Sequence, residues 1–196
     1  MALPPIVQAG SPVLRAAAAP VPAEMLGTKK LRDLAATMAE VMRKAPGVGL
    51  AAPQIGIGLA LIVLEDGESL MSRLGPEERE VRGRVAFPLK VIANPVLTTH
   101  GTGRATFFEG CLSVPGYMAL VERDLEVEVR GVDEKGDPVA WRVSGWPARI
   151  LQHEVDHLRG TLYVDRMITR TFTANAEAPR WISMPADEVK RAVGGG

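Results

Sequence analysis

The strongest constraint on this chain is a pair of histidines four residues apart, His153 and His157, with Glu154 beside the first. Residues four apart share one face of an α-helix, so a helix here lets both imidazoles point at one metal ion. A glutamate in this place can reach a metal-bound water, whose pKa a divalent ion lowers toward about 7, without being a ligand itself. The pattern therefore favours a hydrolytic metal site over a polar helix face that carries two histidines by accident.

The residues around this motif support the helix. Apolar residues recur at helical spacing, namely Ile150, Leu151, Val155 and Leu158. Pro147 suits the first turn, where its missing N–H is no loss, and Gly160 is a suitable residue to end the helix. We therefore expect one helix to begin near Pro147, carry both histidines and end before Gly160.

Two imidazoles do not complete a metal site, so a third protein ligand is needed. Where one large group of zinc proteases has a histidine, this chain has Tyr163, and the downstream Glu177 lies in a segment that reads as a loop. A single cysteine is usually a small buried hydrophobe, but Cys111 lies in segment 109–116, which is rich in glycine and is expected to turn close to a ligand. A thiolate with two imidazoles suits zinc or ferrous iron and leaves a position open for water, so Cys111 is the better candidate.

Elsewhere, the chain alternates between strand-like and irregular patterns. We expect an irregular arm over 1–27, a helix over about 31–43, a shaped loop over 47–56, an exposed insertion over 66–84, strands over 59–64, 85–96, 105–108, 125–130 and 139–143, a turn over 133–138, and a polar tail beyond about Met167. Most strands precede the helix that carries the histidines, which indicates an α+β fold.

Charge and cysteine content exclude several classes of protein. Lys and Arg together number 23, as do Asp and Glu, so no basic surface for nucleic acid is expected, and aromatic residues are only 5% of the chain. No stretch reaches the roughly 20 apolar residues of a membrane helix. One cysteine allows no internal disulfide, which favours a reducing compartment. Residues 1–10 lack the pattern of a signal peptide, so we expect a bacterial cytoplasmic protein or, after loss of a transit peptide, a mitochondrial or plastid one.

Three segments together resemble the peptide deformylases. They are G-V-G-L-A-A-P-Q-I-G over 47–56, E-G-C-L-S over 109–113 and Q-H-E-V-D-H over 152–157, in the family's order. The resemblance extends from about Pro5 to Thr171 and is nearest to the organelle-type branch and its bacterial relatives. It implies antiparallel sheets packed around a central metal-binding helix, with 1–171 as the catalytic domain and 172–196 as a C-terminal tail.

The resemblance also implies a function and a role for each residue. The chain would remove the formyl group from the N-terminal methionine of new polypeptides and release formate. Cys111, His153 and His157 would bind the metal, with Glu154 as catalytic acid/base. Gln54 and the Leu112 backbone N–H would stabilise the oxyanion, and Gly49 would pair with the substrate backbone. Val48 and the apolar part of the metal helix would bind the methionine side chain, with Trp146 at the rim of the pocket. A Glu109–Arg123 pair would support the cysteine segment.

Some alternatives stay open at this point. Gln54 could only bond its own loop, and Trp146 could be ordinary core. The resemblance favours Fe2+ in the cell, while coordination rules also allow Zn2+, Ni2+ or Co2+. A transient contact with the ribosome exit region and a monomer or dimer are expected. An endoprotease with the same helix motif would need a different third ligand, and a metal- or peptide-binding module would not need Glu154.

Overall fold

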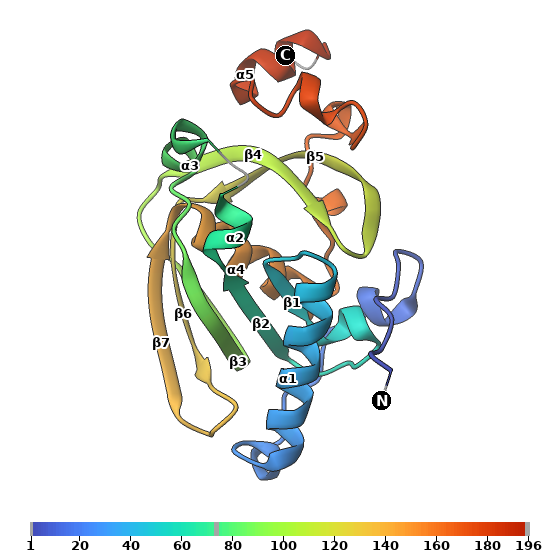
Figure 1. The fold of residues 1–196 in the computed structure, drawn as a ribbon, viewed down its shortest axis with the longest axis vertical. Helices are drawn as coiled ribbons and strands as arrows, with labels where there is room; N and C mark the ends of the chain where they lie inside the picture. Colours follow the sequence, from blue (N-terminus) through green and yellow to red (C-terminus); the bar gives the residue numbers. More distant parts are fainter. Residues whose placement is uncertain (1, 73–74, 195–196) are drawn as a thin grey trace.

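Helix α4, Gly145–Leu158, lies at the centre of the fold and contacts strands of both antiparallel sheets (Figure 1). The computed structural model describes residues 2–72 and 75–194. Pro147 lies in the first turn of α4, as the sequence predicts. Gly160 follows the helix with a positive φ of 70°, and a Cβ there would stand 2.6 Å from the Arg15 carbonyl oxygen. The helix that carries the histidines is therefore confirmed at both ends.

The expected α+β class is confirmed by one sheet of five strands and one of three among the described residues. The larger sheet has the order β1-β2-β3-β6-β7 and the smaller β4-β5-β8. The larger sheet comprises β1 Gly49–Ala51, β2 Leu61–Asp66, β3 Phe87–Thr99, β6 Glu126–Val132 and β7 Pro138–Ser144. The smaller sheet comprises β4 Arg104–Cys111, β5 Val114–Asp124 and β8 Thr173–Ala174.

Helix α1, Lys29–Lys44, covers the larger sheet with the apolar face that its sequence predicts. Its N-terminus is capped by Thr28, whose side chain accepts a hydrogen bond from the Leu31 N–H. Leu31, Met38 and Met42 on its inner face have no exposed surface. They pack with apolar residues of β1 and β2 in one core cluster, so α1 supports the back of the strands that lead into the site.

The β6–β7 hairpin also follows the predicted pattern. Val127 and Val129 are fully buried, whereas the alternating charged residues Glu126, Glu128 and Arg130 are more accessible. The turn is closed by Asp133, whose side-chain oxygen accepts hydrogen bonds from the Lys135 and Asp137 backbone N–H groups. The core side of this hairpin packs on α4.

The segment around Cys111 differs from the predicted turn over 109–116. Only residues 112–113 turn, because β4 continues to Cys111 and β5 begins at Val114. Gly110 pairs with Met118 but Cys111 pairs with Val114, so the register shifts and residues 115–117 bulge from the ladder. Pro115 and Gly116, which suggest a turn in the sequence, lie instead inside β5, where its bulge tolerates them.

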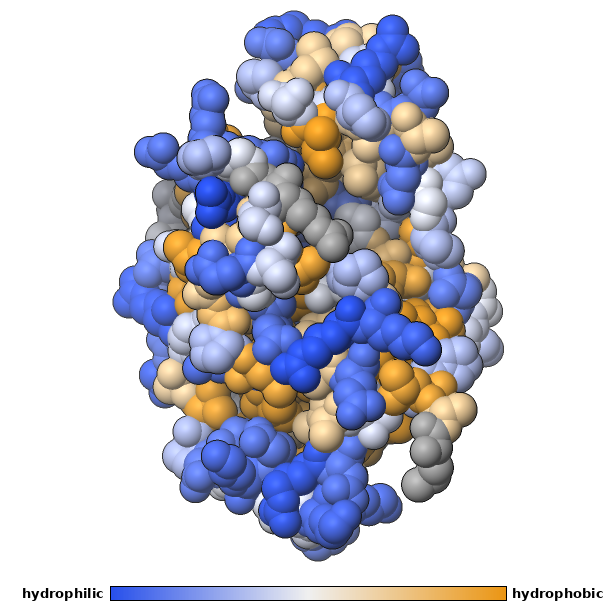
Figure 2. Space-filling view, viewed as in Figure 1, coloured by the Kyte–Doolittle hydropathy of each residue, from blue (hydrophilic) through white to orange (hydrophobic). Residues whose placement is uncertain are grey.

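The prediction of a polar tail beyond Met167 is wrong. This part of the chain contains β8 and helix α5, Ala186–Ala192, and Val189 of α5 is only 1% exposed. Val189 packs with Phe108 and Leu120 of the smaller sheet. One buried residue in a short polar helix leaves almost no periodic signal, and only the sheet beneath it makes the segment fold. In Figure 2 this segment forms the upper lobe, with apolar side chains where it meets the rest of the molecule.

The insertion over 66–84 contains two short helices, α2, Glu68–Met71, and α3, Pro76–Arg82. It is only partly exposed, because Met71 of α2 and Arg82 of α3 are buried. Residues 73 and 74 lie outside the described residues. Asp66 has no exposed surface and accepts two hydrogen bonds from Arg84, at 2.7 and 2.9 Å. A buried bidentate pair therefore fixes the insertion to the end of β2.

In the part of the chain that the structure describes, no helix combines the length and apolarity needed to cross a membrane.

Candidate metal centre

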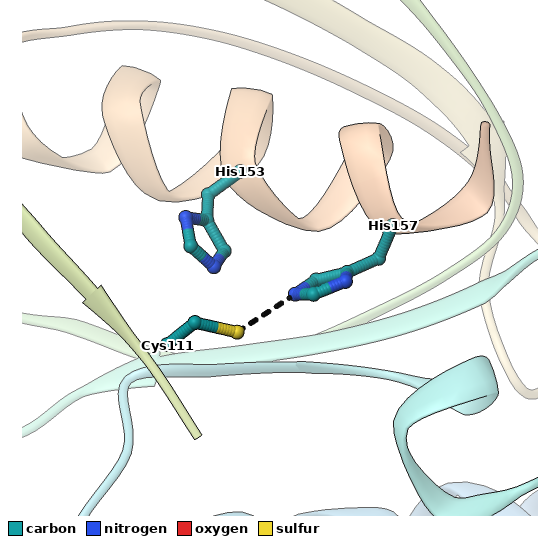
Figure 3. Close-up of side chains that lie close together, drawn as sticks. All are labelled: Cys111, His153 and His157. Atoms are coloured by element: carbon teal, nitrogen blue, oxygen red, sulfur yellow. Dashed lines mark hydrogen bonds between the residues drawn. The ribbon is translucent and has the colours of Figure 1, made fainter. Parts of the chain in front are cut away.

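Three ligand-type side chains meet where α4 faces the end of β4. The ligand atoms of Cys111, His153 and His157 all lie within 4.8 Å of one another. Figure 3 shows the two imidazoles, one helical turn apart, pointing with the thiol toward a common point, and Cys111 Sγ lies 3.3 Å from His157 Nε2. The fold thus brings together two segments that are 42 residues apart in sequence, since residue 153 minus residue 111 is 42.

This donor set fits a divalent transition metal. One thiolate and two imidazoles match zinc, ferrous iron, nickel or cobalt better than the oxygen ligands that calcium or magnesium need. Three ligands also leave a coordination position open, as in catalytic rather than structural sites. Glu177 is not part of this group, and Tyr163 instead places its ring beside His153, with ring centroids 6.4 Å apart. The alternatives for a third ligand that the sequence left open are therefore not supported.

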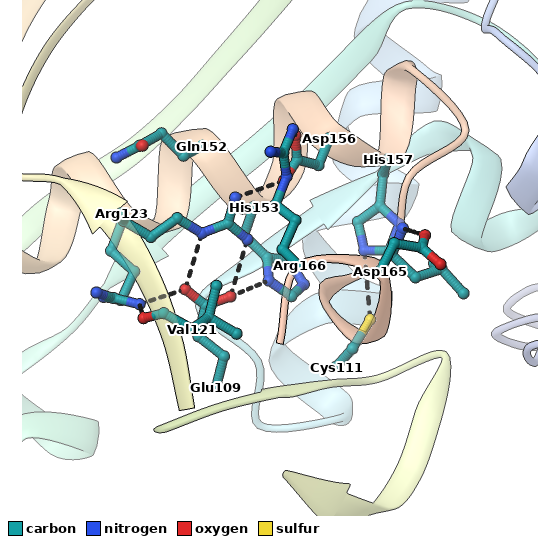
Figure 4. A network of polar contacts seen from close by, with 12 residues as sticks. Glu109, Cys111, Val121, Arg123, Gln152, His153, Asp156, His157, Asp165 and Arg166 are labelled. Carbon is teal, nitrogen blue, oxygen red and sulfur yellow. Dashed lines mark hydrogen bonds and ion pairs between the residues drawn. The ribbon is translucent and has the colours of Figure 1, made fainter. Parts of the chain in front are cut away.

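Glu109 fixes the orientation of the first histidine. Its Oε2 lies 3.1 Å from His153 Nδ1, so this nitrogen donates to the carboxylate and leaves Nε2 to face Cys111. Arg123 donates to both Glu109 oxygens, at 3.0 and 2.9 Å, which confirms the expected pair (Figure 4). Burial alone would raise the pKa of Glu109, but the His153 hydrogen bond and the Arg123 charge lower it below its usual value. Glu109 is therefore a permanent carboxylate that holds its imidazole in one tautomer.

Two charged residues of α4 and Arg166, none of which the sequence pattern singled out, complete this network. Arg149 of α4 donates to Glu109 Oε1 at 2.5 Å and to the Val121 carbonyl at 3.0 Å. Asp156, also on α4, accepts hydrogen bonds from Arg123 and from Arg166. The sequence signal was present, because charged residues among the apolar positions of a central helix must find buried partners.

Glu154 lies beside the ligands with an unused oxygen. It is only 4% exposed, and its Oε2 is buried without a hydrogen-bond partner among the described residues. Burial raises the pKa of Glu154 to about 7. A carboxyl group with such a pKa can exchange a proton at neutral pH. An unpartnered buried carboxylate next to three ligands fits a group that serves a bound water.

The reason for a glycine at position 49 is visible in the backbone of β1. A Cβ on Gly49 would stand 2.3 Å from Glu154 Oε1, closer than any side chain permits. The strand therefore packs its bare Cα against the carboxylate. The family resemblance implies that Gly49 pairs with the substrate backbone, and close contact with Glu154 is a separate reason for a glycine here.

Gln54 contacts both its own loop and the cysteine. Its Oε1 accepts a hydrogen bond from the Ala51 N–H at 2.8 Å, which is the loop contact that the sequence left open. Its Nε2 lies 3.6 Å from Cys111 Sγ and donates to Ser113 Oγ at 3.3 Å. The carbonyl end of the amide is thus occupied by the loop, while the NH2 end points at Cys111 and Ser113.

A cavity of about 530 Å³ opens in front of these groups. Val48, Gly49, Leu112 and Trp146 line it together with Cys111, His153 and Glu154, which lie at the candidate metal site. The expected catalytic, substrate-binding and metal-binding residues thus all border one space except His157, which is only 1% exposed, and the supporting Arg123 is likewise buried away from the cavity. Ile150 is also part of the wall and provides the apolar part of α4 that the sequence analysis expected.

Trp146 is held between arginines at the edge of this cavity. The Arg82 and Arg84 guanidinium carbons lie 4.9 and 5.7 Å from its ring centre, and Arg149 lies 5.8 Å away. Arg84 also lines the cavity. Trp146 is half-buried, packs against a core cluster and also lines the cavity, so it belongs to both the core and the wall. The insertion over 66–84 therefore reaches the site through its arginines.

Comparisons with known proteins identify the family of this chain. The family model for polypeptide deformylase matches residues 3–172. The chain is 53% identical over 171 residues to chloroplastic peptide deformylase 1A of Solanum lycopersicum, covering 87% of this chain and 62% of that protein. It is 49% identical over 182 residues to peptide deformylase 1 of Streptomyces coelicolor, covering 92% of this chain and 81% of that protein. The chain thus spans less than two thirds of the plant relative.

A solved structure gives the same fold. It is a class I type b peptide deformylase from Acinetobacter baumannii bound to Met-Ala-Ser, with a TM-score of 0.75 and 34% identity. The match covers 85% of this chain and 99% of that one. The model match, the relatives and the fold all carry the same description, and this chain belongs to the polypeptide deformylase family.

Proposed function

We propose that this chain removes the formyl group from the N-terminal formyl-methionine of newly synthesised polypeptides and releases formate. The observation that carries the proposal is the buried Glu154 Oε2, which has no hydrogen-bond partner among the described residues and lies beside the Cys111, His153 and His157 group, at the wall of one open cavity. Family membership supports the same reaction class. The related Acinetobacter baumannii protein binds Met-Ala-Ser, a peptide that begins with methionine and carries no formyl group in its name, as the product of such a reaction would.

Cys111, His153 and His157 would hold the metal, which we propose is Fe2+ in the cell, with Zn2+, Ni2+ or Co2+ also accepted by these ligands. When bound, such a cation supplies Lewis-acid chemistry, which acidifies water and polarises a carbonyl group. Glu109 and Arg123 keep His153 in place, so the ligands need little rearrangement.

Glu154 would act as the acid/base. Its Oε2 accepts a proton from the attacking water as the new C–O bond forms at the formyl carbon. It then gives that proton to the methionine nitrogen as the C–N bond breaks, so one water is consumed and formate and a free amine are formed. A pKa of about 7 lets the same carboxyl group take up and return the proton at neutral pH.

Gln54 and Leu112 would stabilise the negative charge that develops on the formyl oxygen. The Gln54 NH2 group points at the ligand Cys111, and Leu112 lines the cavity directly after it. Gly49 would pair with the substrate backbone, and Val48, Ile150 and Trp146 would surround the methionine side chain. Residues 1–171 would then contain all of the catalytic groups.

The partner and the cellular location are parts of the same proposal. A formylated nascent chain is the substrate, so transient contact near the ribosome exit region is expected, by a monomer or dimer. Relatives include bacterial and chloroplast proteins. We propose the bacterial cytoplasm as the location, with a mitochondrion or plastid as the alternative.

The test is formate release from formyl-Met-Ala-Ser by anaerobically purified protein, with Glu154→Gln alongside. Formate from the wild type and its loss in the variant would support the proposal. Cleavage of internal peptide bonds without formate would favour an endoprotease, and bound metal without either reaction would favour a binding module.

A further inference from the structure

The C-terminal segment returns to the cleft through β8. Tyr117 of β5 pairs with Ala174, and Met118 pairs with Thr173. The next residue, Asn175, donates its backbone N–H to the Gly116 carbonyl at 2.8 Å. The match to the family model ends at residue 172, so these contacts come from a part of the chain beyond that match.

An aromatic pair holds this strand in place. The rings of Tyr117 and Phe172 stack with centroids 4.8 Å apart and planes 10° apart. Their exposed fractions are 45% and 41%, so the pair keeps much of its surface accessible. Stacking of this kind favours a defined relative position for the two segments of the chain that carry the rings.

The place where β8 attaches is also the edge of the cavity. Residues 115–117 bulge from the β4–β5 ladder directly after the turn that follows Cys111. Gly116, Tyr117 and Asn175 line the same 530 Å³ cavity as Cys111 and Glu154. Among the described residues, no atom lies within 4 Å of a Cβ built on Gly116, so the surface is open there.

This edge has the chemistry to bind a peptide backbone. The Asn175 side chain is exposed and carries both a donor NH2 group and an acceptor carbonyl, which matches the alternating groups of a main chain. The stacked rings beside it offer an apolar surface. A peptide with its formyl group at the metal ligands must leave the cavity along one of its open sides, and this side is continuous with the ligand Cys111.

We propose that Asn175 and Tyr117 bind the substrate residues that follow the methionine. The inference rests on the proposed deformylase function. Asn175 contacts the peptide directly, and Phe172 is a positioning residue that holds β8 against β5. The C-terminal segment thereby makes the enzyme favour longer peptides over a single formyl-methionine.

The experiment compares kcat/KM for formyl-Met-Ala-Ser with that for formyl-methioninamide, which has no following residues. Asn175→Ala is expected to lower the tripeptide value by about five- to tenfold, mainly through KM, and to change the amide value by less than about twofold. Phe172→Ala should act in the same direction, and Phe172→Tyr, which keeps the ring, should restore the tripeptide value. Glu177→Ala is the matched control, because Glu177 is exposed on the same segment but does not line the cavity.

The outcomes separate the two proposals. Equal losses on both substrates, or no loss on either, would overturn the role of the C-terminal segment while leaving the deformylase function intact. Failure of the wild-type, metal-loaded protein to release formate from either substrate would overturn the proposed function and this inference with it. Thermal unfolding of each variant shows whether a loss merely reflects an unfolded protein.

Discussion

The two ends of the cavity are built in opposite ways: the metal side, around Cys111, His153 and His157, and the outer edge, around Tyr117 and Phe172. On the metal side, the side chains of Glu109 and Arg123 are each only 4% exposed and are joined by two hydrogen bonds. At the outer edge, Tyr117 and Phe172 are nearly half exposed and are joined by stacking and a two-residue strand. Buried, hydrogen-bonded charges leave the side chains around His153 little conformational freedom, so the position of this imidazole is fixed. The exposed outer edge can change with little effect on the chemistry.

The largest effect is expected where the reaction itself takes place. Glu154→Gln keeps the size of the side chain but removes the proton acceptor, so formate release should fall by ~100- to 10,000-fold. Metal content and thermal stability should stay near the wild-type values, since Glu154 is not a ligand. Wild-type activity in this variant would show that the buried carboxylate is not the acid/base.

Breaking the buried network tests the rigidity of the metal side. Arg123→Met leaves Glu109 and Asp156 without a shared cation and should lower the free energy of unfolding by ~3–5 kcal/mol. Metal affinity should fall by ~10- to 100-fold, because His153 loses its fixed orientation. Both are measured by chemical denaturation and by metal titration of the purified variant.

Arg104→Met is the matched control for that change. Arg104 lies on β4 and pairs with Glu122 at 2.8 Å, but the two side chains are 51% and 52% exposed. A pair in this environment should contribute less than ~1 kcal/mol. Equal destabilisation by both substitutions would remove the contrast between the buried and the exposed ion pairs.

The amide of Gln54 should have an effect on rate of intermediate size. Gln54→Ala removes the NH2 group that points at Cys111, and loss of one oxyanion donor typically lowers kcat by ~100- to 1000-fold. The Ala51 N–H also loses its acceptor, so stability is measured in parallel. Unchanged kcat would assign Gln54 to its loop alone.

A single methyl group at position 49 tests how closely β1 holds Glu154. In Gly49→Ala the new Cβ would overlap Glu154 Oε1, so the carboxylate must move, and a shift of ~1 Å can cost ~100-fold in rate. Gly58→Ala is the control, because no atom of residues 2–72 or 75–194 lies within 4 Å of a Cβ there and its φ is not positive. Full activity of Gly49→Ala would mean that the position of Glu154 is not set by β1.

The smallest effect is expected at the outer edge. Phe172→Ala removes one stacked ring and should lower the free energy of unfolding by only ~0.5–1.5 kcal/mol. Thermal unfolding measures this change, with Phe172→Tyr as the variant that keeps the stack. A loss as large as that of Arg123→Met would show that the edge is as important for folding as the metal side.

Local pattern was sufficient for several elements and failed at others for identifiable reasons. The spacing of apolar residues predicted α1, α4 and β6, because each has one buried face. β5 was missed, because Pro115 and Gly116 resemble a turn and are tolerated only at its bulge. α5 was missed because Val189 alone anchors it, and that residue is buried only by contact with the smaller sheet.

By itself, the sequence determined the candidate chemistry, since the spacing of His153 and His157 favours one shared metal ion and the single Cys111 is the best candidate for the third ligand. Only the tertiary structure decided how those groups are held. Arg149 and Asp156 enter the network, Gly49 packs on Glu154, and Asn175 reaches the cavity because sheets and helix bring together segments that are far apart in the chain. Ligand identity depends on the chemistry of a few residues, whereas burial and close contact depend on every element that packs around them.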